Sequence, residues 1–321
     1  MGRNSKWIEG EPEDSTQRVA RRALEARIER MCHYLERAVE EPKSETENVH
    51  QLRVFARRTA AALEIFDAWL PQRRGKWVSK QVKRVRRAAG AARDLDVLRI
   101  RWSAWSERMF SRPAQLLLDH VHVCRREAQQ PIEEVYDKLA AKRFGRRTSR
   151  FLRRVRTRDE ETARCEPFGR MARASLGRLV GPFLTAARAE MVAAEALHAF
   201  RIQGKQVRYA MEIFGGAFDA EFRDELYPLV ATLQERLGAI NDHVTAQAYL
   251  ARWNEEIESD PLRQAIELGI QHERHHFESC RQEFLAWWTA ERRDDLARRF
   301  ADYVQFDTVT NQPPRWEERA G

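Results

Sequence analysis

Apolar residues recur at helical spacing along most of the chain. An amphipathic helix is expected over 15–41, because apolar side chains return every three or four positions and Pro42 follows. These side chains are Leu24, Ile28, Met31, Leu35 and Val39. The pattern favours a long helix with one buried face.

The rest of the first half repeats this pattern. Helices are expected over 44–69, 74–92 and 95–110, and from Pro113 through the basic run 142–158. Ser44 with Glu47 forms a capping box for the first of these, and Asp94 is the expected N-cap of the helix over 95–110.

The second half follows the same plan. Helices are expected over 167–190, 195–214, 222–239, 260–289 and 292–304. Asp242 is the expected cap of a helix after 239, and Asp260-Pro261 is an N-cap and N1 pair. No sustained strand alternation occurs, so the predicted fold is all-α, with two antiparallel helical bundles over 15–158 and 166–304. The termini 1–14 and 305–321 are expected to be loose.

Residues 50–97 reappear without a gap, 148 positions later, as 198–245. The matched pairs are His50/His198, Arg53/Arg201, Glu64/Glu212, Ile65/Ile213, Phe66/Phe214, Gly90/Gly238 and Asp94/Asp242. An ungapped register predicts one helical unit used twice. Because polar residues recur as well as apolar ones, the repeat preserves a polar surface, and function is expected there.

The repeated polar residues form a cationic row on each copy. The second copy carries His198, Arg201, Lys205, Arg208 and Glu212 at steps of three and four, which places them on one helix face. At the same phases the first copy carries His50, Arg53, Arg57, Ala60 and Glu64, with Arg58 beside them. Glu64 and Glu212 are interpreted as partners that orient the arginines, and Asp94 and Asp242 as helix caps.

The next helix of the first half adds a further row of cations. Lys76, Lys80, Lys83 and Arg87 share a face, Arg84 lies beside them, and the segment from Arg73 to Arg93 contains no acid. Like charges at this spacing repel by a few tenths of a kcal/mol per pair. Each contact to a phosphate oxygen contributes on the order of 1.5–3 kcal/mol, so a dense anion would outweigh the repulsion.

The charge of the whole chain is unevenly distributed. The 321 residues carry a net charge of +8. Up to Arg158 there are 37 Lys and Arg against 21 Asp and Glu, a balance of +16, whereas the remainder has a balance of −8. Such a basic half favours a polyanion as partner: nucleic acid, an anionic membrane or a phosphate polymer.

The four cysteines form no CxxC pair, so neither a zinc ribbon nor a disulfide framework is indicated. Free thiols are typical of a reducing compartment, and a cytoplasmic location is expected. No apolar stretch approaches the ~20 residues of a membrane span, so membrane association is not expected. No cofactor is expected.

Four stretches of this sequence resemble the CHAD family, the conserved histidine α-helical domain. They are HQLRVFARRTAAALEIF at 50–66, GAARDLDVL at 90–98, HAFRIQGKQVRYAMEIF at 198–214 and LGAINDHVT at 237–245. The resemblance implies two pseudo-twofold-related bundles around a central basic cleft that binds inorganic polyphosphate, often at polyphosphate granules. The ExExK strand of the CYTH domain, a frequent fusion partner, is missing, so the chain is expected to be a stand-alone CHAD protein.

The resemblance also predicts which residues bind polyphosphate. Carried over residue by residue, the family's cleft falls on His50, Arg53, Arg57, Arg58, His198, Arg201, Lys205 and Arg208, and the first-half rows add Lys76, Lys80, Lys83, Arg84, Arg87 and Arg93. Gln206 stands where the second copy should match Arg58, and 222–239 is far less basic than 73–93. The first half is therefore expected to supply most of the phosphate contacts.

Two other functions are considered. His272-Glu273-x-x-His276 has the form of a zinc-protease motif, but Ser279 and Gln282 replace the Gly and His of its longer version. Nucleic-acid binding fits the charge, but Trp102, Trp105, Trp287 and Trp288 lie in apolar patterns and are expected in the core, which leaves few stacking platforms. Acids near the rows are single, so polyphosphate hydrolysis is not expected and the protein is not predicted to be an enzyme. Oligomeric state is not predicted.

Overall fold

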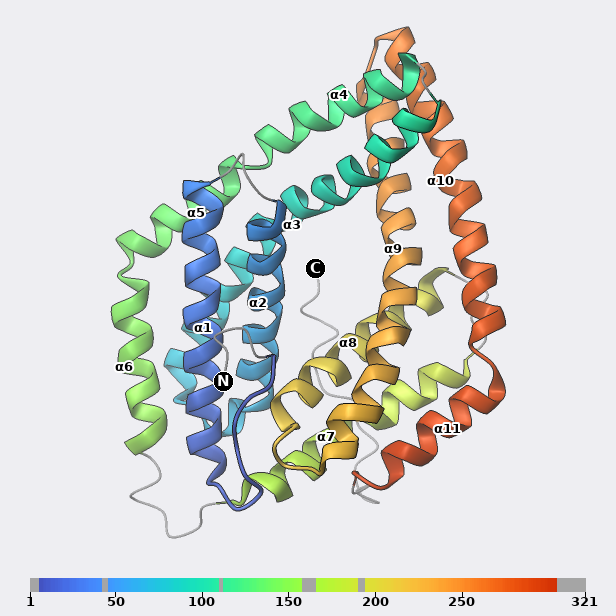
Figure 1. Cartoon of the computed structure of the whole chain (residues 1–321). Coiled ribbons are helices and arrows are strands. Elements are labelled where there is room, and N and C mark those ends of the chain that lie inside the picture. Colours follow the sequence, from blue (N-terminus) through green and yellow to red (C-terminus); the bar gives the residue numbers. More distant parts are fainter. Residues whose placement is uncertain (1–5, 42–45, 110–111, 158–165, 190–193, 305–321) are drawn as a thin grey trace. The chain divides into compact units, whose positions relative to one another are not determined.

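The computed structural model describes residues 6–41, 46–109, 112–157, 166–189 and 194–304 (Figure 1). Within these ranges the regular elements are helices, and the single isolated bridge joins Ser15 to Pro167. The first-half helices are α1 (Thr16–Glu40), α2 (Thr46–Ile65), α3 (Gln72–Met109), α4 (Arg112–Glu127), α5 (Gln130–Ala141) and α6 (Phe144–Thr157). They are followed by α7 (Phe168–Arg188), α8 (Ala194–Phe214), α9 (Tyr227–Glu256), α10 (Asp260–Trp287) and α11 (Ala290–Ala301). The all-α prediction is confirmed.

The helix bounds agree with the 148-residue offset of the sequence. Subtracting 148 from the bounds of α8 gives 46–66, against 46–65 for α2. The first residue of α10 corresponds in the same way to the first residue of α4. The pseudo-twofold relation between the halves stays a prediction.

The chain divides into two compact units. Unit 1 contains Met1–Ala23, Arg158–Leu237 and Phe284–Gly321, and unit 2 contains Leu24–Thr157 and Gly238–Glu283. The boundary between 157 and 158 falls where the first bundle was expected to end. The other boundaries fall inside α1, α9 and α10, so residues 238–283 join the first-half helices rather than the second bundle.

Unit 2 is built around the apolar sides of α2 and α3, which pack against each other. Val78, Val82 and Val85 are fully buried on one side of α3. Farther along, Trp102 packs edge-on against Trp253 at 6.3 Å between ring centroids, in a core shared by α3, α4, α9 and α10. Because these apolar positions recur every three or four residues, the cations between them lie on the opposite side of α3.

The core of unit 1 is rich in aromatic residues. Phe183 of α7 stacks on Phe200 of α8 at 5.2 Å between centroids, and Phe300 of α11 meets Phe183 edge-on at 6.2 Å. Trp288 donates its indole N–H to the carbonyl of Ala187 at 3.3 Å. These contacts hold α8 against α7 and so orient the polar side of α8.

Residues 6–14 are not loose, in contrast to the expectation for the N-terminus. The amide of Ile8 donates to the carbonyl of Glu212 at 3.1 Å, and Trp7 packs edge-on against Tyr227. Gly216 allows this close approach, because a Cβ there would lie 2.1 Å from the carbonyl oxygen of Gly10. The segment is thus fastened to α8. Residues 305–321 and the expected cap Ser44 lie outside the described residues.

Several helix boundaries differ from those expected, and α9 in particular continues through Asp242 to Glu256, although the sequence predicts a helix that ends at 239. The helix α3 continues through Asp94 without a break, and the helix expected from Pro113 to 158 is divided into α4, α5 and α6. The division before α6 occurs at Arg143, whose φ of 50° lies in the left-handed region that favours glycine.

Candidate polyanion-binding surface

Arg53 joins α2 to α3. Its guanidinium donates to the carbonyl of Gly90 at 2.8 Å and pairs with Asp94 at 3.2 Å. Both charged side chains retain some exposure, 20% for Arg53 and 30% for Asp94. Asp94 is therefore an interior residue of α3 that orients Arg53, and the expectation that it caps a helix is wrong. Asp242 is likewise interior, in α9 rather than at a helix start.

His50 lies in a strongly cationic environment. Its pKa is below the ordinary value because burial disfavours the imidazolium, and because Arg93, Arg57 and Arg53 repel it. The carboxylate of Glu47 opposes the shift without reversing it. The free protein thus concentrates positive charge around this histidine, which suits an anionic ligand.

Arg86 is a member of this group that the sequence analysis did not single out. Its pKa is lowered, first by desolvation and then by the charges of Arg57 and Arg87, while Glu64 opposes the shift. The acid-free run containing Arg86 was a signal, but only the packing of α2 on α3 brings it toward Arg57. Glu64 lies close enough to Arg86 for its charge to raise the pKa of that guanidinium, and its role as an orienting acid stays a prediction.

The α3 row consists of Lys76, Lys80, Lys83, Arg84 and Arg87. Lys76, Lys80 and Arg87 are exposed, and Lys83 and Arg84 are half-buried. The guanidinium of Arg84 donates to the side-chain oxygen of Gln81 at 2.8 Å, which fixes its direction. All the first-half residues that the sequence predicts to bind polyphosphate lie on α2 and α3, and therefore in unit 2.

Arg58 differs from the other α2 cations. Its guanidinium lies over the ring of Phe55 at 5.3 Å from the centroid. One residue advances 100° around a helix, so Arg58 also leaves the side that carries Arg53 and Arg57. It flanks the α2 row, consisting of His50, Arg53 and Arg57, instead of extending it.

The α8 row, consisting of His198, Arg201, Lys205 and Arg208, lies in unit 1. His198 is exposed, and the three cations are half-buried. Gly204, within this row, allows close packing of α8 on α9, because a Cβ there would lie 2.0 Å from the side-chain nitrogen of Gln234. Whether the α8 row and the α2 row share a cleft stays a prediction.

Glu212 ends the α8 row as a buried acid. Its side chain is fully buried and accepts a hydrogen bond from the hydroxyl of Tyr227 at 2.9 Å. Its charge also raises the pKa of Arg208, and its role as an orienting partner stays a prediction. A buried carboxylate needs such partners, so Glu212 has a structural role as well.

The zinc-protease motif at 272–276 is part of a buried network in unit 2. Glu273 is fully buried and accepts hydrogen bonds from Trp102 at 2.7 Å, Arg101 at 2.5 Å and His243 at 2.7 Å. Burial disfavours its charged form, but the bond from His243 and the charge of Arg101 outweigh this, so its pKa is lowered. Glu273 is therefore occupied as a structural acid. In the described ranges no group of three or more His, Cys, Asp or Glu could hold a metal ion.

The tryptophans considered as stacking platforms have contacts of their own. Trp102 and Trp288 are buried, as expected. Trp105 and Trp287 are half-buried. Trp105 stacks on His272 at 4.9 Å, and the guanidinium of Arg236 lies 4.7 Å from the ring centroid of Trp287.

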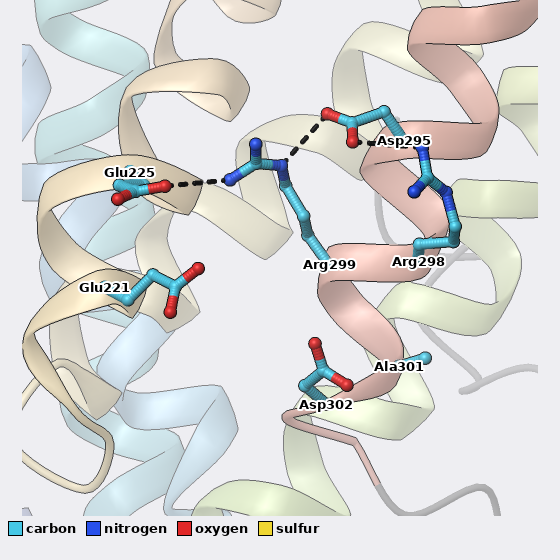
Figure 2. A pocket seen from close by; sticks show the side chains of 7 residues that line it. All are labelled: Glu221, Glu225, Asp295, Arg298, Arg299, Ala301 and Asp302. Atoms are coloured by element: carbon cyan, nitrogen blue, oxygen red, sulfur yellow. Dashed lines mark hydrogen bonds and ion pairs between the residues drawn. The ribbon is translucent and has the colours of Figure 1, made fainter.

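A surface pocket of about 520 Å³ lies in unit 1, away from the expected binding residues (Figure 2). Figure 2 shows Arg299 of α11 between Glu225, at 3.0 Å, and Asp295, at 2.9 Å. Glu221 and Asp302 add further acid to its lining. Its arginines are neutralised, so the pocket does not suit a polyanion.

Comparisons with known proteins agree with this architecture. The sequence model of the CHAD domain matches residues 22–251. The fold is similar to the crystal structure of the CHAD domain from the plant Ricinus communis, with a TM-score of 0.65 and 22% identity over 89% of this chain and 98% of that one. It is also similar to PptA from Streptomyces chartreusis, with a TM-score of 0.58 and 16% identity over 86% of this chain and 99% of that one. No curated protein sequence matches the chain. None of the helices in the described residues is long and apolar enough to cross a membrane.

Proposed function

Because the chain belongs to the CHAD domain family, which is linked to polyphosphate binding, we propose that it binds inorganic polyphosphate through α2 and α3 of unit 2. The α8 row of unit 1 supplies further phosphate contacts. The observation that carries the proposal is the concentration of cations around His50, whose pKa is lowered by burial and by three neighbouring arginines. A chain of phosphates supplies the negative charge that this surface lacks.

Each part of the surface has a role in the proposal. Asp94 holds Arg53 in place, so that this arginine can offer its remaining N–H groups without losing further side-chain entropy. Arg57 and the cations of the α3 row donate most of the hydrogen bonds to the phosphate oxygens. Each charge-assisted contact contributes on the order of 1.5–3 kcal/mol, which exceeds the few tenths of a kcal/mol of repulsion between neighbouring cations.

A phosphate polymer suits this surface better than nucleic acid does. Recognition of single-stranded nucleic acid relies on aromatic rings that stack against bases. The α2 and α3 rows consist of cations and one histidine, and Trp102, farther along α3, is buried. Polyphosphate has no bases and requires only positive charge and hydrogen-bond donors.

The proposed role is binding without turnover, in the cytoplasm and at polyphosphate granules. Granules present polyphosphate at high local density, so the protein attaches to them through the same surface that binds a free chain. Glu64 and Asp94 act in this proposal as orienting acids for arginines rather than as metal ligands.

The experiment is a competition assay with fluorescently labelled long-chain polyphosphate. We expect unlabelled polyphosphate to displace the probe at a much lower phosphate concentration than single-stranded DNA or ATP, with no shortening of the chain on prolonged incubation. Displacement by DNA at equal phosphate concentration would indicate a nucleic-acid-binding protein instead. A progressively shorter polyphosphate would reveal an enzyme.

A further inference from the structure

The basic surface of unit 2 continues beyond α3. Residues 138–155 carry eight Lys and Arg and no acid, a density that matches the nine Lys and Arg and no acid of 73–93. Arg147, Arg150 and Arg154 share one side of α6 by their spacing, and all three are exposed. We call these three, with Arg143 just before them, the α6 row.

The α6 row lies beside the α3 row. The guanidinium of Arg147 lies 3.7 Å from the ring centroid of Trp77 in α3, and Phe144 packs against the same ring at 5.8 Å. Trp77 stands between Lys76 and Lys80 on the α3 helix, so the contact brings the two rows together.

Electrostatics support the same arrangement. The pKa of the Lys142 ammonium is below its ordinary value because desolvation and four neighbouring cations disfavour the charged form. These cations are Arg84, Lys80, Lys138 and Arg147. Cations of α3, α5 and α6 therefore converge at this place within unit 2.

Arg143 adds a separate observation. Its φ of 50° is a left-handed conformation that glycine adopts with less strain than other residues. The chain has an exposed arginine there instead, at the turn that leads into the α6 row. Residues in unfavourable conformations concentrate at functional sites, which is consistent with a charge needed at this position.

The helix of the second half that corresponds to α6 is α11, and it shows which charges a helix with only a structural role carries at this place. At the 148-residue offset, Arg146 and Arg147 correspond to Asp294 and Asp295, while Arg150 corresponds to Arg298. In α11 the arginines pair with acids, as in the contact of Arg298 with Asp295 at 3.3 Å. The fold therefore does not require a helix with arginines and no acids at this place in the repeat.

We propose that the α6 row and Lys142 form a second anion-binding surface, over which a long polyphosphate chain continues after it has bound the α2 and α3 rows. The inference rests on the proposed function and adds that affinity depends on chain length through α6. Trp77 is covered by Arg147, so its ring is not available to stack on a base. The apolar side of α6, including Phe151 and Val155, is buried in unit 2, so this helix cannot insert into a lipid surface.

The test uses the full chain and a triple variant, Arg143→Gly, Arg150→Gln and Arg154→Gln, which keeps Arg147 on Trp77. Binding of tripolyphosphate and of long-chain polyphosphate is measured by calorimetry at several salt concentrations. We expect the salt slope for the long chain to decrease by about two, because three phosphate contacts are lost. Its affinity is expected to fall about tenfold, roughly twofold per contact, because all three arginines are exposed and contacts of exposed charges are weakened by water and salt. Tripolyphosphate, which is too short to reach both surfaces, is expected to bind as tightly as before.

A matched control removes the same charge elsewhere. The variant Arg170→Gln, Arg188→Gln and Arg298→Gln changes three exposed arginines of unit 1 and is expected to leave the salt slope unchanged. The single change Arg143→Gly, which relieves the left-handed arginine, is expected to weaken long-chain binding without lowering the thermal midpoint. That combination separates a binding role from a structural one.

The remaining outcomes distinguish this inference from the proposed function. If the triple variant binds long chains with the affinity and salt slope of the wild type, the inference is wrong while the proposed function stands. The inference is equally wrong if the variant loses affinity for single-stranded DNA and retains it for polyphosphate. If the wild type binds neither polyphosphate, the proposed function itself fails.

Discussion

The two copies of the repeat carry different charges at the same helix positions. In α3, residues 73–93 carry nine Lys and Arg and no acid, whereas the matching residues 221–241 carry two Arg and four acids. The acid at the end of each row differs as well. Glu64 is exposed beside Arg86, whereas Glu212 is fully buried with Tyr227.

This difference shows how one copy of a repeat can specialise. In the second copy, acids neutralise the arginines and are used in packing, as Figure 2 shows for Arg299 between Glu225 and Asp295. In the first copy residues 73–93 contain no acid, and the charges of Arg57 and Arg87 lower the pKa of Arg86 in the free protein. We therefore expect ligand binding to depend mainly on the first copy, and stability to depend more on the acids of the second.

The largest expected effect is reversal of charge on α3. The double variant Lys80→Glu and Lys83→Glu is expected to weaken polyphosphate binding about 100-fold, since two contacts worth ~1.5 kcal/mol each are lost. Calorimetry at low salt measures the change. Arg170→Glu with Arg188→Glu on α7 is the control for total charge, and an equal loss in both variants would mean that only net charge matters.

The acids at the ends of the two rows, Glu64 and Glu212, are expected to differ in how much they contribute to stability. Glu212→Ala leaves the buried hydroxyl of Tyr227 without its acceptor, and should lower the free energy of unfolding by roughly 1–3 kcal/mol. Glu64→Ala, at an exposed position, should change it by no more than about 0.5 kcal/mol. Urea unfolding of both variants tests this, and similar losses would remove the distinction between the copies.

A smaller difference in polyphosphate affinity is expected when one cation is removed from each row at matched positions. Arg57→Ala should weaken polyphosphate binding about tenfold, or ~1.4 kcal/mol, because Arg57 acts together with the α3 cations. Lys205→Ala, 148 positions later, should weaken it about threefold, since α9 offers no comparable row. Parallel titrations decide the order, and a larger loss at Lys205 would reverse the comparison.

The smallest expected effect is the pH dependence that His50 contributes. In the free protein its pKa is lowered, so His50 is neutral at pH 7 and gains a proton below its ordinary value of 6.5. Bound phosphate favours the imidazolium and raises this pKa, so binding takes up a proton and affinity rises as pH falls below neutrality. The gain in affinity is expected to be smaller than the effects of the charge changes described above, because it comes from one protonation equilibrium.

The control for this prediction is His50→Gln, which keeps a hydrogen-bond donor but cannot be protonated. Its affinity should be less dependent on pH than that of the wild type, between neutrality and pH 5. The same pH profile in both proteins would exclude the protonation of His50 from binding.

Much of the fold could be predicted because apolar spacing identifies helices directly. The first helix was expected at 15–41 and spans 16–40. The failures concern the expected caps, the N-terminal segment and the long helix expected from Pro113. Asp94 has the side chain of an N-cap, but its pairing with Arg53 satisfies it inside an unbroken helix, and local sequence cannot reveal a partner 41 positions away. The division before α6 was missed because Arg143 adopts a conformation that sequence rules assign to glycine.

The positions of the candidate residues on their helices were predictable to a similar extent, while their binding role stays a prediction. Rows at helical spacing identified the α2, α3 and α8 cations, which the structure displays on their helices. Arg86 and the α6 row were missed, since only tertiary packing brings α2 and α6 against α3. That residues 238–283 join the helices of the first half could not be inferred from a repeat that predicts two successive bundles.

The attachment of Ile8 to the carbonyl of Glu212 has a practical consequence for anyone who shortens this protein. The family match begins at residue 22, and a clone trimmed to that point would lose Trp7 from its place on Tyr227 and expose one end of α8 to water. Such a truncation would loosen the packing of α8, which carries the second-copy arginines, although every one of these arginines would still be present. A shortened variant made for purification should therefore keep residues 6–14.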